Sequence, residues 1–218
     1  MRCSNEMFIK GLRNFVNKVS VGNYKKWQML KLWIVVVVFA ALSLIGELSF
    51  TLIFLDIAAI ALMIACTVIY REQEKSKLFL VAALFSLVFA FLMTSCFLRL
   101  ALWMEIPDML FLLIPIIMAW IIIIPITYGV VQLLLKTGYY GKKRNSRLEA
   151  IGATGGSGIG LIIAYSFGPT AAIILVLFVG TTVLVSIATT CAMRYKYVMK
   201  YNLESSMKTV GDKFEKEK

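Results

Sequence analysis

The sequence predicts an all-α integral membrane protein that crosses the bilayer six times, and two observations carry this prediction. Of its 218 residues, 60% are hydrophobic and only 16% are charged, a balance that a soluble domain does not have. The apolar residues also gather in long runs, and a transmembrane helix needs about 20 of them in succession. The chain is long enough for roughly six crossings, so we expect no separate soluble catalytic domain.

The N-terminal segment, residues 1–31, is expected to be a basic amphipathic segment in the cytoplasm. Six apolar side chains recur at three- and four-residue intervals, with basic and amide side chains between them: Phe8, Ile9, Leu12, Phe15, Val16 and Val19. This spacing predicts a helix that lies on the membrane surface with its apolar face inward. A topology signal made only of positive charge accounts for the same residues and also places them in the cytoplasm.

The membrane domain, residues 32–193, contains six apolar runs, each of which predicts one span. They are Leu32 to Gly46, Phe50 to Ile69, Leu78 to Leu102, Met109 to Leu135, Ala150 to Phe167 and Thr170 to Met193. Between the first two runs the chain can turn only at Gly46 and Glu47, where we expect a tight hairpin. No small-residue cleavage site follows the first run, so we expect a retained helix rather than a signal peptide.

The basic residues assign the connecting segments to two sides of the membrane. The net charge is +11, and 22 of the 23 Lys and Arg residues lie in residues 1–31, 70–77, 136–149 and 194–218. The other short connections between predicted spans contain no Lys or Arg, and they include Glu47, Glu105 and Asp108. Because basic segments stay in the cytoplasm, we expect both termini there and an even number of spans. The same asymmetry predicts contact with anionic lipid headgroups and makes a nucleic acid partner unnecessary.

The C-terminal tail, residues 194–218, mixes charges of both signs with apolar residues. Its apolar positions include Tyr197, Val198, Tyr201 and Leu203, followed by Met207, Val210 and Phe214. These residues could extend the last span as a cytoplasmic helix that docks a partner. A solvated, frayed tail is the alternative.

The residue types that carry most catalytic and metal chemistry are absent or scattered. Histidine is absent, which excludes His-based triads, His-ligated metal sites and imidazole proton relays. The four cysteines, Cys3, Cys66, Cys96 and Cys191, show no metal-ligand spacing. Three of them lie inside apolar runs, where a thiol behaves as a small hydrophobic group. We therefore expect no enzyme activity, no cofactor and no metal.

Two charges inside the predicted spans need an explanation, because a charge in hydrocarbon costs about 2.5 to 3.5 kcal/mol on insertion scales. Asp56 lies inside the outer end of the second span, and Arg99 lies at a similar depth in the third. We predict that they form an intramembrane ion pair that fixes the register of the two helices. The alternatives are that Asp56, alone or with Glu47, binds a cation or a proton, or that these side chains snorkel to the interface.

The fourth span contains Pro115 and Pro125, with Trp120 between them. Proline removes a backbone hydrogen bond and clashes with the preceding turn, so we predict that this helix is kinked or broken. Broken helices near the midplane are how many transporters expose backbone to a substrate. A plain kink is the alternative, because proline is common in membrane helices.

A stripe of small residues runs along the fifth span at every fourth position. It consists of Gly152, Gly156, Gly160, Ala164 and Gly168. This glycine-zipper pattern predicts the close approach of another helix backbone, either within one bundle or between subunits. The run from Gly155 to Gly160 has a superficial likeness to a P-loop. It lacks the following Lys and Ser/Thr, so we predict no nucleotide site.

These features favour a multi-pass subunit of a transport, export or secretion assembly without its own ATPase or catalytic site. In outline the arrangement is similar to exporter permeases that pair with a separate ATPase, although the loop Tyr70 to Lys77 is short for a coupling helix. The alternative is a non-transporting membrane anchor, regulatory or immunity protein. A polar path at the midplane would distinguish the two, and Thr94, Ser95, Thr127 and the hydroxyls of the sixth span are its candidates. We expect a protein partner or self-association, and a location in a bacterial plasma membrane.

Overall fold

The protein is helical throughout the residues that its structure, a computed structural model, describes: 5–17, 26–43, 49–71, 76–103, 109–141 and 175–203. The helices are α1 (Asn5–Asn17), α2 (Lys26–Ser43), α3 (Phe50–Arg71), α4 (Lys77–Trp103), α5 (Met109–Lys136) and the short 3-10 helix η1 (Tyr139–Gly141). A further helix, Leu175–Tyr201, is called the C-terminal helix below. The predicted all-α fold class is confirmed.

Four of these helices are long and apolar enough to cross a membrane, namely α3, α4, α5 and the C-terminal helix. The bounds of α3, α4 and α5 agree with the predicted spans to within two residues. A shorter apolar stretch, Met29–Ala41, lies within α2 and overlaps the predicted first span. The C-terminal helix continues about two turns beyond Met193, where the predicted sixth span ends. The structure is thus compatible with a membrane location.

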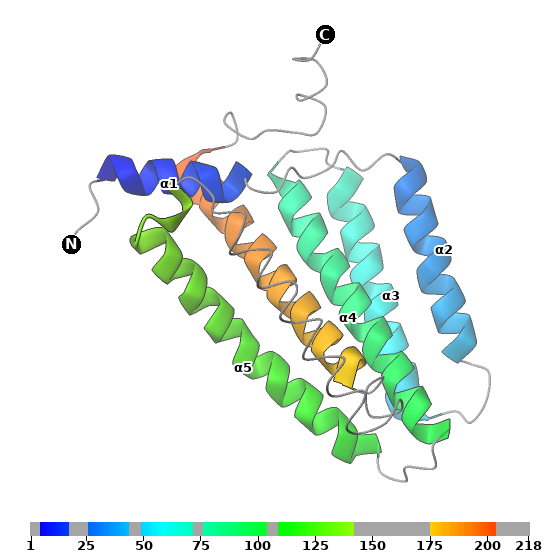
Figure 1. The fold of residues 1–218 in the computed structure, drawn as a ribbon. Coiled ribbons are helices and arrows are strands. Elements are labelled where there is room, and N and C mark those ends of the chain that lie inside the picture. The colour runs from blue at the N-terminus through cyan, green and yellow to red at the C-terminus, as the bar shows by residue number, and fades with distance from the viewer. Residues whose placement is uncertain are drawn as a thin grey trace.

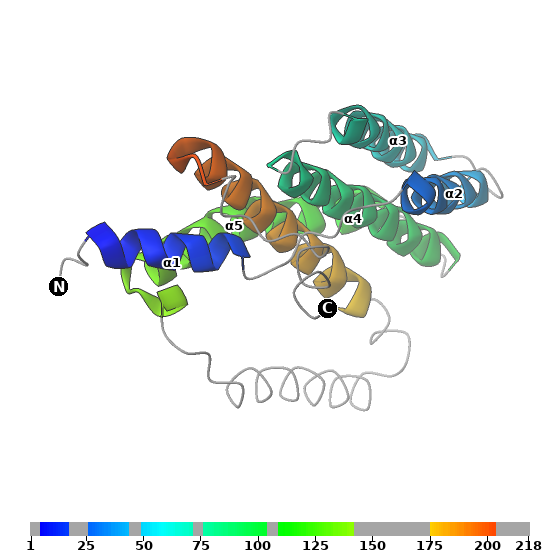
Figure 2. The same ribbon diagram turned by 90° about the horizontal axis from the view of Figure 1, so that it is seen from above.

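The long helices form a bundle that α1 covers at one end (Figure 1). Helices α2 and α4 run away from this covered end, whereas α3, α5 and the C-terminal helix run toward it. Helix α4 lies in the middle, with α3 and α2 on one side and α5 and the C-terminal helix on the other. Seen from above, α1 crosses over α5 beside the end of the C-terminal helix (Figure 2).

Helix α5 continues without interruption through Pro115 and Pro125, and both prolines are exposed. The residue between them turns toward the bundle, where the ring of Trp120 lies 5.4 Å from that of Phe91 on α4 in an edge-to-face contact. Neither proline therefore breaks the helix, and the predicted kink stays a prediction.

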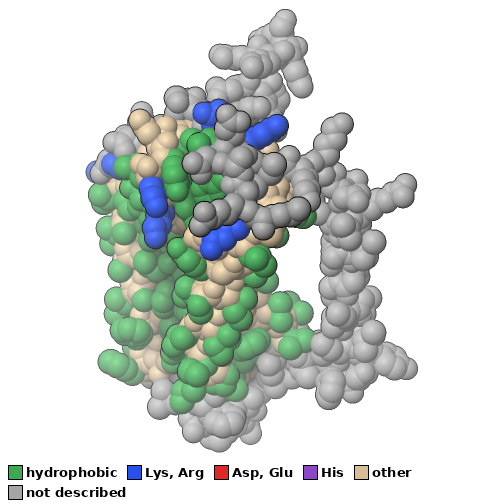
Figure 3. Space-filling model, turned by 90° about the vertical axis from the view of Figure 1, so that its left-hand side faces the viewer, with side chains coloured by type: hydrophobic (Ala, Val, Ile, Leu, Met, Phe, Trp, Pro, Cys, Tyr) green, Lys and Arg blue, Asp and Glu red, His purple; other side chains and the backbone are tan. Residues whose placement is uncertain are grey.

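The outer surface of the bundle is apolar along its length. Figure 3 shows hydrophobic side chains over the body of the molecule and Lys and Arg side chains toward the end that contains α1. On α5 the exposed apolar side chains include Ile114, Ile117, Met118, Ile121, Ile122, Ile124, Ile126 and Leu133. Contiguous apolar surface of this extent is what a membrane helix presents to lipid or to another helix.

The predicted fifth span, Ala150 to Phe167, and the glycine stripe from Gly152 to Gly168 lie outside the described residues. So does the predicted hairpin at Gly46 and Glu47. These three predictions stay predictions.

Candidate functional site

The predicted intramembrane charge site lies between α3 and α4, near the end of the bundle opposite α1. Asp56 is buried, and its carboxylate Oδ1 accepts a hydrogen bond from the Ser95 hydroxyl at 3.1 Å. Ser95 precedes Arg99 by one helical turn, so both side chains lie on the same face of α4. Cys96 lies within electrostatic range of both Asp56 and Arg99. The structure thus brings the two charges to one junction, and their direct ion pair stays a prediction.

The hydroxyls that could have marked a polar path do not converge in the described part of the chain. Thr94 donates to the carbonyl of Ala90 on its own helix at 2.8 Å. Thr127 of α5 and Ser186 of the C-terminal helix share a hydrogen bond of 3.0 Å. Four threonines of the C-terminal helix bond to carbonyls three or four residues earlier: Thr181, Thr182, Thr189 and Thr190. Each of these described hydroxyls bonds within its own helix or to one hydroxyl of a neighbouring helix, and none of these bonds extends beyond a single pair of helices.

Gly180 marks a close approach between the C-terminal helix and α4. A Cβ at this position would lie 2.9 Å from the terminal methyl carbon of Met93. The absence of a side chain therefore lets the methionine pack against the backbone of the facing helix.

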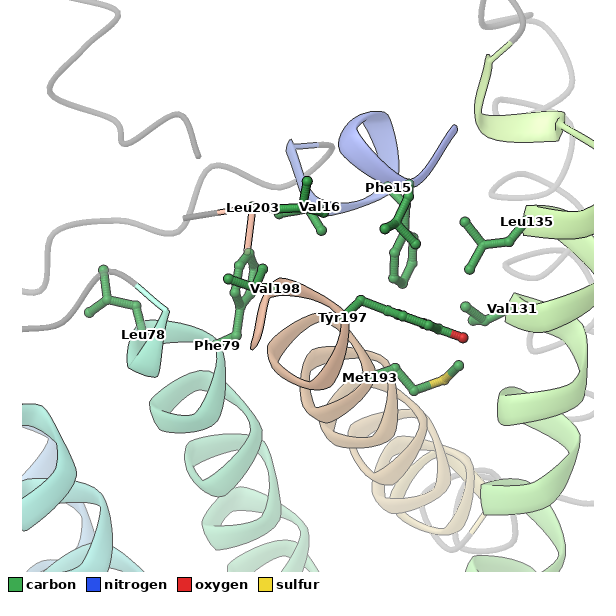
Figure 4. Close-up of a cluster of buried hydrophobic side chains, with 11 residues drawn as sticks. Phe15, Val16, Leu78, Phe79, Val131, Leu135, Met193, Tyr197, Val198 and Leu203 are labelled. Atoms are coloured by element: carbon green, nitrogen blue, oxygen red, sulfur yellow. The ribbon is translucent and has the colours of Figure 1, made fainter. Parts of the chain in front are cut away.

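The covered end of the bundle contains a second cluster, which we call the cap (Figure 4). It joins α1 to the adjacent ends of α4, α5 and the C-terminal helix. Its buried members are Leu12, Phe15, Val16, Leu78, Phe79, Val131, Leu135, Met193, Tyr197, Val198 and Leu203. Because four helices contribute to it, the cap sets the position of α1 relative to the bundle.

Two helix ends direct residues into the cap. At the end of α5, Gly138 adopts a left-handed conformation with φ of 68°, which turns the chain into η1 beneath α1. At the end of the C-terminal helix, Asn202 is left-handed with φ of 49°, and Leu203 N–H donates to the Val198 carbonyl at 3.1 Å. This six-to-one bond is the Schellman arrangement, and it returns the buried Leu203 to the helix that precedes it.

Phe15 is the aromatic centre of the cap and is fully buried. Its ring centroid lies 5.0 Å from that of Tyr140 and 6.4 Å from that of Tyr197. The adjacent Asn14 donates its side-chain amide to the Tyr140 carbonyl at 2.9 Å. Helix α1 is thus held to η1 by a polar contact and by ring packing.

Arg194 lies beneath Phe15 and is only 6% exposed. Its guanidinium carbon lies 4.9 Å from the centroid of the Phe15 ring, within cation–π range. Among the described residues, none accepts a hydrogen bond from the buried Nε. Burial raises the pKa of Tyr140, and the positive charge of Arg194 opposes that rise, so the phenol stays neutral near pH 7.

Gln132 connects α5 to the C-terminal helix next to the cap. Its side-chain amide donates to the Tyr197 hydroxyl at 2.5 Å and to the Tyr128 hydroxyl at 3.2 Å. Lys196 lies 5.9 Å above the Tyr128 ring. These contacts join the end of α5 to the part of the C-terminal helix that contains Arg194 and Tyr197.

The sequence predicted a helix in the N-terminal segment, but not what its apolar face contacts. Leu12, Phe15 and Val16 are buried against protein side chains, whereas the expectation was an apolar face turned to lipid. Arg194 was assigned to the beginning of the tail. The signal that could have placed it is the continued helical spacing of Tyr197, Val198 and Tyr201 after the last predicted span.

The remaining chemistry of the described residues is sparse. Cys66, Cys96 and Cys191 are free thiols. The described part of the chain has no group of three His, Cys, Asp or Glu residues that could hold a metal ion.

Comparisons of the chain with protein-family models, with curated proteins and with solved structures found no match. The fold and the two sites define a class only: the described part of the chain is all-helical and has four helices that could span a membrane.

Proposed function

We propose that the protein crosses the membrane six times and has both termini in the cytoplasm. The directions of the described helices support this, because successive helices α2 to α5 alternate between the two ends of the bundle (Figure 1). Helix α5 and the C-terminal helix run in the same direction. The six-span arrangement needs a return crossing between them, which the proposal assigns to Ala150 to Phe167.

The position of the basic residues supports a cytoplasmic cap. Apart from Arg99, the Lys and Arg side chains that the structure describes belong to α1 or to the cap-side ends of the long helices: Lys10, Arg13, Lys31, Arg71, Lys77, Lys136, Arg194, Lys196 and Lys200. Positive residues of membrane proteins stay on the cytoplasmic side. Helix α1 would then lie at the cytoplasmic surface of the membrane, which we take to be a bacterial plasma membrane, with Lys10 and Arg13 available to anionic headgroups.

Within that membrane, we propose that the chain is a subunit of a transport, export or secretion assembly, with no ATPase or catalytic site of its own. One observation carries this proposal. Only 17% of the most apolar stretch of α5 and 22% of that of the C-terminal helix are buried, against 50% in α4. Sparsely covered helices on one flank of a bundle leave room for other helices to pack.

A second candidate is a non-transporting membrane anchor, regulatory or immunity protein. The hydrogen bonds of the described hydroxyls favour this second candidate. Thr94 bonds within its own helix and Thr127 bonds to Ser186, so these residues do not form a polar path that a substrate could follow. Neither candidate needs an enzymatic step, a cofactor or nucleic acid.

Affinity purification of the tagged chain after extraction in a mild detergent tests the two candidates. Ile121 on α5 and Ile64 on α3 are 58% and 52% exposed, so Ile121→Phe and Ile64→Phe are matched enlargements on opposite flanks. We expect an ATPase or channel subunit to co-purify with the unmodified chain and with Ile64→Phe, and to be lost with Ile121→Phe. A chain that purifies alone, even after crosslinking in intact membranes, would contradict the assembly and favour the second candidate.

A further inference from the structure

Arg194 is a buried charge for which the described residues provide no counter-charge. Its side chain is 94% buried. The one carboxylate among the described side chains, Asp56, lies in the first two turns of α3, and α3 begins at the end of the bundle opposite α1 (Figure 1). A buried guanidinium is tolerated when its charge is compensated and its donors are bonded. The position therefore indicates that an anion belongs next to it.

One N–H donor of the guanidinium has no acceptor among the described residues. The centroid of the Phe15 ring lies 4.9 Å from the guanidinium carbon of Arg194. This cation–π contact involves the flat face of the guanidinium and not its N–H donors. The N–H donors of a guanidinium point outward in its plane, and among the described residues none accepts from Nε. Planar N–H donors match the oxygens of a phosphate and can bind two of them at once.

The surroundings of Arg194 combine basic and tyrosine side chains, as the headgroup level of a membrane protein does. Arg194 lies about two turns before the end of the C-terminal helix and contacts Phe15 of α1. Exposed Lys136, Lys196 and Lys200 lie on the same helix ends, together with exposed Tyr139 and Tyr201. Tyrosine and lysine gather at this depth in membrane proteins, where lipid phosphates lie.

We propose that Arg194 binds the phosphate of an anionic lipid headgroup at the seam between α1, η1 and the C-terminal helix. Phe15 covers the face of the guanidinium, and the phosphate bonds to its edge. The site rests on the proposed cytoplasmic position of the cap but not on the proposed assembly, so a failed co-purification leaves it standing.

Thermal unfolding of the purified full-length chain in a neutral maltoside detergent tests the site, with tryptophan fluorescence as the readout. Phosphatidylglycerol, phosphatidylcholine and inorganic phosphate are titrated separately. Lys196→Gln is the matched control for Arg194→Gln, because Lys196 is an exposed cation on the same helix. We expect phosphatidylglycerol to raise the Tm of the unmodified chain and of Lys196→Gln. In Arg194→Gln its apparent affinity should fall about tenfold, the factor that corresponds to about 1.4 kcal/mol.

The other outcomes each decide the question. A shift with inorganic phosphate alone would support the phosphate site and identify a free anion as its source. An equal phosphatidylglycerol shift in Arg194→Gln would overturn it. In neutral detergent without any anion, Arg194→Gln should unfold at the same or a higher temperature, because an uncompensated buried charge is removed. A lower Tm there, or a failure to fold, would show that groups of this chain already stabilise the Arg194 charge, which also contradicts the proposal.

Discussion

Replacement of Phe15 by alanine should release α1 from the bundle without unfolding the long helices. The side chain is fully buried and contacts Tyr140, Tyr197 and the Arg194 guanidinium. Truncation of a buried phenylalanine costs about 3 to 5 kcal/mol. We take the lower end of about 3 kcal/mol because α1 has a single turn of buried contacts and can relax. Since 1.4 kcal/mol is a factor of ten, amide hydrogen exchange in α1 should accelerate roughly 100-fold.

Hydrogen exchange measured by mass spectrometry checks this value in detergent. Ile9→Ala is the internal control, because Ile9 lies on the same helix and is 41% exposed. Its exchange should stay within a few-fold of the unmodified chain, and peptides from α3 and α4 should not change in either variant. Equal acceleration by the two variants would refute the protein-facing assignment of Phe15, because lipid contact along the whole apolar face would make both positions matter.

Three helix contacts can each be tested by substitution. Gly180→Ala should fold normally, because the flexible end of the facing methionine on α4 can shift, whereas Gly180→Leu should lower the yield of folded protein in gel filtration. Thr127→Val should lower the Tm, because it leaves the Ser186 hydroxyl without its partner. The double variant with Ser186→Ala should recover part of the loss, and strictly additive losses would mean that the hydrogen bond does not contribute to stability. Asp56→Asn and Arg99→Gln should each lower the Tm, and if the two charges interact, the combined variant should again lose less than the sum.

The sequence predicted the long helices well because a span is fixed by hydrophobic length alone. The apolar runs that define α3, α4 and α5 each begin and end within three residues of a charged residue, and no tertiary information is needed to find them. The same reasoning located Asp56 and Arg99 in adjacent helices at one depth. Hydropathy does not distinguish a lipid-facing side chain from one that faces another helix, so it gave no sign that Ser95 donates to the carboxylate.

The cap could not be predicted from the same pattern. An amphipathic helix with Leu12, Phe15 and Val16 on one face has the same sequence whether that face meets lipid or protein. The apolar face of α1 meets protein because residues from four helices gather at one end of the bundle. Leu203 is one of them, and the left-handed Asn202 before it turns the chain back toward the cap. Arg194 was read as a tail residue because positive charge is expected at a cytoplasmic helix end. The helical spacing of Tyr197, Val198 and Tyr201 indicates that Arg194 lies within a helix, but it does not indicate burial beneath Phe15.

Cysteine accessibility in intact cells tests the central claim, that the cap and both termini share the cytoplasmic side. Single cysteines replace Lys10 on α1, Phe50 at the beginning of α3 and Lys200 on the C-terminal helix, all exposed positions, in a chain without native cysteines. A maleimide that cannot cross the membrane should label position 50 in intact cells. Positions 10 and 200 should react only after permeabilisation. Labelling of position 10 or 200 in intact cells, or protection of position 50, would contradict the account.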